Sequence, residues 1–144
     1  MSEPRFFEES ELVSVLTSQP LDQMLDYKAP SGGCWQGDFV EVPLGPRKTL
    51  GVIWCAGKGD FEYNKVRSVI RILDVVPMQP STQEFLRRVS DYTLSPMHTM
   101  LRLATRAPGL GDPASMRYVY RKGQAEAGRM TDARLRVLAV LQNS

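Results

Sequence analysis

The chain has 144 residues, 42% of them hydrophobic, and this length corresponds to one ordinary domain or to a small domain with part of a second. No run of about 18 apolar residues occurs, which excludes a membrane-spanning helix, and the acidic start MSEPRFFEESE argues against a secretory signal and for the cytoplasm. The net charge of +2 hides an uneven distribution, since residues 1–43 carry two basic and eight acidic side chains whereas residues 44–144 carry sixteen basic and eight acidic ones.

The first half of the chain alternates short apolar runs with turns. Residues 1–11 are mostly polar and are expected to form a flexible tail. Runs typical of strands or extended segments follow at 12–16, 24–27, 39–43, 50–56 and 66–73. A basic turn over residues 44–48, Leu-Gly-Pro-Arg-Lys, separates the third run from the fourth.

The second half is helical in pattern. Ser81 and Glu84 have the spacing of a capping box, and apolar residues recur at helical spacing from 85 to 92. Ser95-Pro96 starts a second helix, which ends near residue 107. Residues 108–130 are expected to be a linker with one strand-like piece at 117–121. Thr131 then caps a last helix within residues 131–144, where the chain lacks the partners needed for a complete domain.

These elements predict an α+β fold: a small, curled, mostly antiparallel sheet, or partial barrel, followed by two helices, together spanning residues 12–107. No enzyme motif accompanies it. The sequence has no phosphate-binding loop, a single histidine makes a catalytic triad improbable, and Cys34, Cys55 and His98 cannot assemble a clustered zinc site. We therefore expect neither catalytic residues nor metal ligands.

The basic turn is a candidate phosphate-binding element. Gly45 permits close backbone approach, and the adjacent Arg47 and Lys48 could meet phosphate, although a hairpin turn with solvated charges is an equally good interpretation. Lys65 and Arg67 could share its face of the sheet. Trp54 lies inside an apolar strand, which favours a place in the core over base stacking.

The segment Leu25-Asp26-Tyr27 places a carboxylate between two apolar side chains, so that Asp26 points to the opposite face of its strand. A lone carboxylate is a poor phosphate ligand. It could accept a hydrogen bond from a hydroxyl, such as that of a terminal sugar.

Five segments together resemble the amino-terminal domain of the primosomal protein N′ (PriA) family of restart helicases. They are Pro20–Tyr27, Gly37–Gly45, Gly51–Ile53, Val69–Asp74 and Ser90–Met97, which match family segments in order and spacing over residues 12–106. Residues 131–142 resemble the first helix of the winged-helix domain that follows in the family. The chain is therefore expected to be a fragment of a longer protein.

The resemblance implies recognition of the 3′ end of a nascent DNA strand at stalled or repaired forks. The family's pocket residues fall on Leu25, Asp26, Gly45 and Arg67, and Tyr27 adjoins them. Leu25 replaces a phenylalanine, which weakens base stacking, and Arg67 replaces a lysine, which keeps the charge but changes the geometry. Asp26 would accept a hydrogen bond from the terminal hydroxyl, and Arg47, Lys48 and Lys65 would contact phosphates.

The resemblance also implies a wider setting. Full-length members are bacterial ATP-dependent 3′-to-5′ DNA helicases, and ATP, magnesium and zinc would bind only in the motor region outside this chain. Single-strand-binding protein and other primosome proteins are expected partners, at the nucleoid in the cytoplasm. Two alternatives stay open: a protein-interaction module that docks on single-strand-binding protein or on the helicase lobes, and a small RNA-binding barrel.

Overall fold

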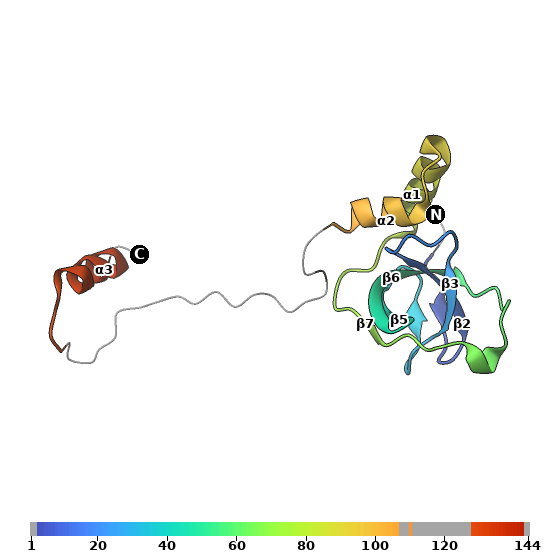
Figure 1. Cartoon of the computed structure of the whole chain (residues 1–144), viewed down its shortest axis with the longest axis horizontal. Coiled ribbons are helices and arrows are strands. Elements are labelled where there is room, and N and C mark those ends of the chain that lie inside the picture. The colour runs from blue at the N-terminus through green and yellow to red at the C-terminus, as the bar shows by residue number, and fades with distance from the viewer. Residues whose placement is uncertain (1–2, 107–109, 111–127, 143–144) are drawn as a thin grey trace. The chain divides into compact units, whose positions relative to one another are not determined.

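The computed structural model describes residues 3–106, 110 and 128–142, and it divides the chain into two compact units, Met1–Asp112 and Pro113–Ser144. The first unit contains a sheet followed by two helices (Figure 1). Its strands are β1 (Phe6–Phe7), β2 (Leu12–Thr17), β3 (Leu25–Lys28), β4 (Cys34–Trp35), β5 (Phe39–Leu44), β6 (Arg47–Ala56) and β7 (Arg71–Ile72). Its helices are the short 3₁₀ helix η1 (Tyr63–Lys65), α1 (Pro80–Thr93) and α2 (Met97–Ala104). The predicted α+β class is confirmed.

The main sheet has five strands in the order β3-β2-β6-β5-β7, and every pairing within it is antiparallel. β1 and β4 form a separate antiparallel pair. The five-stranded sheet curls until its edges approach each other. Lys28 on β3 accepts a hydrogen bond from the Val69 amide and donates one to the Arg67 carbonyl, which creates a single parallel bridge to Ser68. The sheet is thus strongly curled, as predicted, without closing into a barrel.

The curl gives each central strand two buried faces, because apolar side chains alternate between two cores. On β6, Ile53 enters the core inside the curl, whereas Val52 and Trp54 enter the core beneath α1 and α2. The burial of Trp54 confirms the core interpretation of this residue. Leu86 of α1 and Leu101 of α2 fill the second core from the helix side. Burial of such side chains is worth roughly 1.5–3 kcal/mol each, which holds the helices on the sheet.

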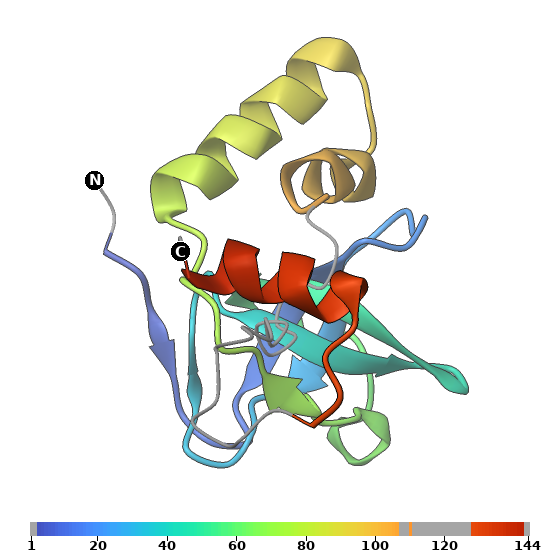
Figure 2. The same cartoon turned by 90° about the vertical axis from the view of Figure 1, so that its left-hand side faces the viewer.

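The two long helices and η1 lie at opposite ends of the sheet, as both views of the unit show (Figures 1 and 2). α1 begins at Pro80 after an N-cap at Gln79 that makes no side-chain capping bond, so the expected capping box of Ser81 and Glu84 is wrong. Pro80 at the first position already removes one free amide there. Glu84 turns instead toward the arginines of the next turn.

The expected flexible tail over residues 1–11 is wrong at Phe6–Phe7. These two residues pair with β4, and the Phe7 side chain is fully buried in the core inside the curl. The polar residues around this pair obscured its apolar character in the sequence. The domain also continues past residue 107, since Leu110 packs against the core beneath the helices.

The expected strand over residues 66–73 is wrong for most of its length. Only Arg71–Ile72 forms a strand, at the edge of the sheet beside β5. Before it the chain runs along the β3 edge through the Ser68 bridge, so its backbone is shared between two edges. The apolar run at residues 66–73 therefore corresponds to the segment that connects the two edges of the curled sheet, and not to a regular strand.

The second unit contains α3 (Asp132–Gln142). The Arg134 amide donates to Thr131 Oγ1 at 3.5 Å, which fits the predicted cap. The strand-like piece predicted at 117–121 lies outside the described residues, and the assignment of this unit to a winged-helix domain stays a prediction. Among the helices that are described, none is long and apolar enough to cross a membrane.

Candidate nucleic-acid interface

A hollow of about 260 Å³ lies between β3, the β5–β6 turn and η1, and we call it the η1 hollow. Six of the eight predicted site residues line it: Leu25, Asp26, Tyr27, Gly45, Lys65 and Arg67. Arg47 and Lys48 lie just outside, where β6 leaves the turn. Ligand sites for drug-sized molecules are typically about 300–1,000 Å³, so the η1 hollow matches part of a strand, on the order of one nucleotide.

Two hydrogen bonds tie the walls of the η1 hollow together. The Tyr27 hydroxyl donates to the Pro43 carbonyl at 2.9 Å, and Arg67 Nη1 donates to the Gly45 carbonyl at 3.0 Å. Burial raises the pKa of Tyr27, an effect that the Arg67 charge partly offsets, so the hydroxyl stays a donor at neutral pH. Because a guanidinium has five donors, Arg67 keeps most of them for an anion.

Gly45 shapes the rim of the η1 hollow. It occupies the first position of a two-residue hairpin turn between Leu44 and Arg47, with φ +58°. Glycine is favoured there because a side chain makes the left-handed backbone costly. A Cβ at Gly45 would meet no atom within 4 Å, so the space beside the turn is open to a ligand.

Asp26 lies on the face of β3 away from Tyr27, as the alternation predicted. Its Oδ1 accepts from Ser14 Oγ at 2.6 Å, and its Oδ2 accepts from the Gly59 amide at 2.8 Å. The carboxylate therefore holds the loop that leads to η1. An ionised carboxylate offers about four acceptor positions, which leaves room for a further donor. Its role toward a terminal hydroxyl stays a prediction.

The side chains predicted to contact phosphates differ in whether a nearby carboxylate already balances their charge. Lys65 Nζ lies 2.7 Å from Glu62, and Lys48 Nζ lies 3.9 Å from Glu41. Within the described part of the chain Arg47 has no carboxylate partner, and Arg67 contacts a neutral carbonyl. The two arginines thus offer the most available positive charge beside the η1 hollow.

Sequence reasoning missed Phe61, whose side chain is 62% exposed on the η1 hollow. The structure places Lys28 Nζ 4.1 Å from the centre of the Tyr63 ring. The signal for Phe61 was a bulky ring in the otherwise polar stretch 57–65, where no buried partner could be expected.

Two larger hollows, of about 680 and 810 Å³, flank α1. Each is lined by two acidic side chains and one basic one: Glu3, Glu84 and Arg87 in the first, Asp22, Asp91 and Lys58 in the second. The η1 hollow has the reverse balance, with Lys65 and Arg67 against Asp26. Size favours the α1 hollows, but for a polyanion the sign of the charge decides, and it favours the η1 hollow. No cluster of potential metal ligands occurs among the described residues.

Residues 14–106 match the family model of the PriA 3′DNA-binding domain (3′BD). The chain belongs to this family. The match covers the curled sheet from Ser14 onward, the η1 hollow and both long helices, and it confirms the resemblance that the sequence segments indicated. The protein is thus a DNA-binding module that recognises DNA 3′ ends in replication restart, and the protein-interaction alternative is not favoured. Among curated proteins, none matches the chain.

Proposed function

We propose that the η1 hollow receives the terminal nucleotide at the 3′ end of a nascent strand, at a stalled or repaired fork. The observation that carries the proposal is the convergence of five residues from β3, the β5–β6 turn and the segment after η1 on one hollow of nucleotide scale: Leu25, Asp26, Tyr27, Gly45 and Arg67. Its excess of positive charge and the open space beside the turn support the same assignment.

Each group has a distinct task in this proposal. Arg67 binds the terminal phosphate with the guanidinium donors that the Gly45 carbonyl does not use. Lys65, Arg47 and Lys48 hold the backbone further along the strand. Asp26 accepts a hydrogen bond from the terminal 3′ hydroxyl, a group that a continuing strand lacks.

The chain works within a longer restart protein of bacteria, at the nucleoid in the cytoplasm. It catalyses nothing itself and delivers the strand end to an ATP-dependent 3′-to-5′ helicase motor, where ATP, magnesium and zinc bind. Single-strand-binding protein and other primosome proteins are its partners through the full-length protein. Of these activities, only the contact with DNA is assigned to residues of the first unit.

A fluorescence titration tests the assignment with oligomers that carry a free 3′ hydroxyl, a 3′ phosphate or an RNA backbone. The wild-type protein is expected to prefer the free DNA end. Asp26→Asn is expected to reduce this preference more than total binding, by up to roughly 10- to 150-fold, since a hydrogen bond to a charged group is worth about 1.5–3 kcal/mol.

Ser14→Ala is the matched control for Asp26→Asn. It removes the hydroxyl that donates to Asp26 but leaves the carboxylate in place. Retained preference in Ser14→Ala together with loss in Asp26→Asn assigns the selectivity to the carboxylate. An Asp26→Asn variant that still discriminates as the wild type does would refute the role of Asp26, and a wild type without any end preference would refute the site.

A further inference from the structure

Phe61 is an exposed aromatic ring on the η1 hollow. Its side chain is 62% exposed, although a phenylalanine gains most from burial. The ring shares the η1 hollow with the cations Lys65 and Arg67 and with the aliphatic Leu25. An apolar flat surface thus lies beside positive charge, which is the combination that proteins use for single strands.

The loop that carries Phe61 is held on both sides of the ring. Before it, the Gly59 amide donates to Asp26 Oδ2 at 2.8 Å. After it, the Tyr63 hydroxyl donates to the Ser10 carbonyl at 2.8 Å. These bonds fix the backbone on either side of Phe61, so the exposed ring is presented by an ordered loop, and binding requires little further ordering of that loop.

The other aromatic rings of this region are already engaged. Tyr27 is 4% exposed and its hydroxyl is bonded to Pro43, while Trp54 belongs to the core beneath the helices. Tyr63 carries Lys28 over its ring. Among the described residues that line the η1 hollow, Phe61 is the one aromatic ring open to a ligand.

We propose that Phe61 is the platform on which the terminal nucleobase stacks when the 3′ end occupies the η1 hollow. This inference rests on the proposed function. Arg67 then binds the phosphate beside the stacked base, and Lys65 holds the backbone further along the strand. Because every base has a flat face and Phe61 has no hydrogen-bonding group, the platform accepts all four bases with similar affinity.

Three variants test the platform. Phe61→Leu keeps an apolar side chain but loses the flat ring, whereas Phe61→Tyr keeps an aromatic ring at this position. Phe85→Leu is the matched control, since Phe85 is also 62% exposed but lies on α1, outside the η1 hollow. Both positions are exposed, so the melting temperature of each variant is expected to stay near that of the wild type.

Binding is measured with oligomers whose terminal base is intact, absent or replaced by the fluorescent base 2-aminopurine. Phe61→Leu is expected to weaken binding of the intact end by about 5- to 150-fold, as base–aromatic stacking is worth about 1–3 kcal/mol. On the abasic end it is expected to change binding less than about twofold. Phe61→Tyr and Phe85→Leu are expected to bind as the wild type does. The fluorescence of 2-aminopurine is expected to be quenched by the wild type, Phe61→Tyr and Phe85→Leu, but not by Phe61→Leu.

The outcomes separate the two proposals. If the wild type prefers free 3′ ends but Phe61→Leu matches it on both intact and abasic ends, the platform is refuted and the site stands. If Phe61→Leu weakens both ends equally, Phe61 supports the loop without stacking, and the platform is refuted as well. If the wild type shows no preference for a free end, the proposed function is refuted, whatever the Phe61 variants show.

Discussion

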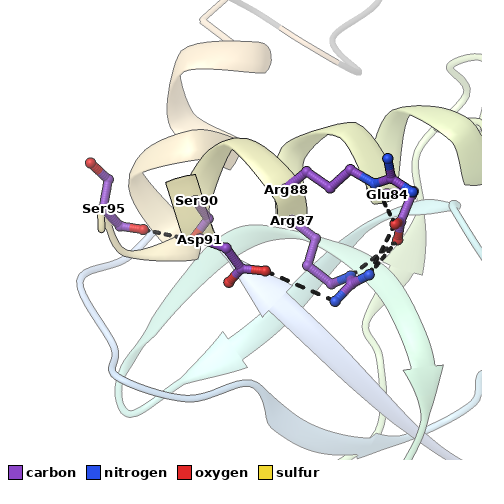
Figure 3. Close-up of polar contacts among 6 residues, drawn as sticks. All are labelled: Glu84, Arg87, Arg88, Ser90, Asp91 and Ser95. Atoms are coloured by element: carbon purple, nitrogen blue, oxygen red, sulfur yellow. Dashed lines mark hydrogen bonds and ion pairs between the residues drawn. The ribbon is translucent and has the colours of Figure 1, made fainter. Parts of the chain in front are cut away.

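Two regions of the molecule carry arginines on the surface, and they use the charge differently. On α1, Arg87 and Arg88 both donate to the Glu84 carboxylate, at 2.8–2.9 Å, and Arg87 also lies 3.9 Å from Asp91 (Figure 3). In the η1 hollow, Arg67 donates to a neutral backbone carbonyl. Hydrogen bonds from Arg88 and Arg87 lower the pKa of Glu84, so this carboxylate stays ionised at neutral pH.

The number of cations on a surface therefore does not by itself determine where a polyanion can bind. A phosphate that approaches α1 meets arginines whose charge two carboxylates already balance. A phosphate that approaches the η1 hollow meets a guanidinium with free donors and no carboxylate bonded to it. The α1 cluster is a solvated network that contributes little to stability, whereas the η1 hollow is open for a ligand.

The largest expected effect on DNA binding comes from replacing one arginine in each region with alanine. Arg67→Ala is expected to weaken binding of a free-3′-end oligomer by roughly 10- to 150-fold, because a hydrogen bond to a charged group is worth about 1.5–3 kcal/mol. Arg87→Ala is expected to change binding less than about twofold. Equilibrium titrations at one fixed salt concentration measure both affinities. A larger loss of affinity in Arg87→Ala than in Arg67→Ala would mean that DNA binds at α1 and not at the η1 hollow.

A second substitution sharpens the comparison through the backbone. Gly45→Ala and Gly32→Ala both place a Cβ in open space at positive φ, +58° and +85°. Each is expected to cost about 1–2 kcal/mol of stability, measured by urea unfolding. Only Gly45→Ala is expected to weaken DNA binding further, by about tenfold, because its methyl group enters the space for the ligand. Equal binding by the two variants would mean that no ligand occupies that space.

The salt dependence ranks the remaining cations. Arg47→Ala is expected to flatten the log–log slope on single strands by about 0.7, the contribution of one phosphate. Lys48→Ala is expected to flatten it less, since Glu41 already lies 3.9 Å from its ammonium group. Arg88→Ala is expected to leave the slope unchanged, and a flattening there would place DNA on α1.

The smallest effect is expected from the second unit. Deletion of residues 113–144 is expected to leave the melting temperature and 3′-end binding nearly unchanged, as Met1–Asp112 forms a compact unit of its own. Deletion of residues 108–144 also removes Leu110, which packs against the core beneath the helices, and is expected to lower the melting temperature by about 4–8 °C per kcal/mol lost. Thermal unfolding of the two truncated chains distinguishes these results.

Much of the fold was predictable because the strands around Val13, Val40 and Ile53 are short apolar runs bounded by turns. The elements that sequence reasoning missed are stabilised by distant partners. Phe6–Phe7 forms a strand only because Cys34–Trp35 lies opposite, and residues 66–70 are divided between two sheet edges. Local patterns contain no information about such pairings.

Residues within recognisable segments, such as Asp26 and Gly45, could be assigned to the candidate site from the sequence, and they line one hollow in the structure. The structure adds what those residues contact: Asp26 already holds the Gly59 loop, and Arg67 donates to the Gly45 carbonyl at the wall of the η1 hollow. Phe61 was missed because its exposure on the η1 hollow depends on where the loop is held and not on any local pattern. From the sequence, Lys48 and Arg47 were equally good candidates for phosphate contacts. In the structure, Glu41 pairs with Lys48 and not with Arg47.

The most direct test of the central claim is a titration of the isotope-labelled full chain with a short single strand that ends in a free 3′ hydroxyl, followed by amide chemical shifts. We expect the largest shifts on the η1 hollow, at residues 25–27, 45 and 61–67, and only small shifts on α1. The largest shifts on α1, around Glu84 and Asp91, with an unperturbed η1 hollow, would contradict it.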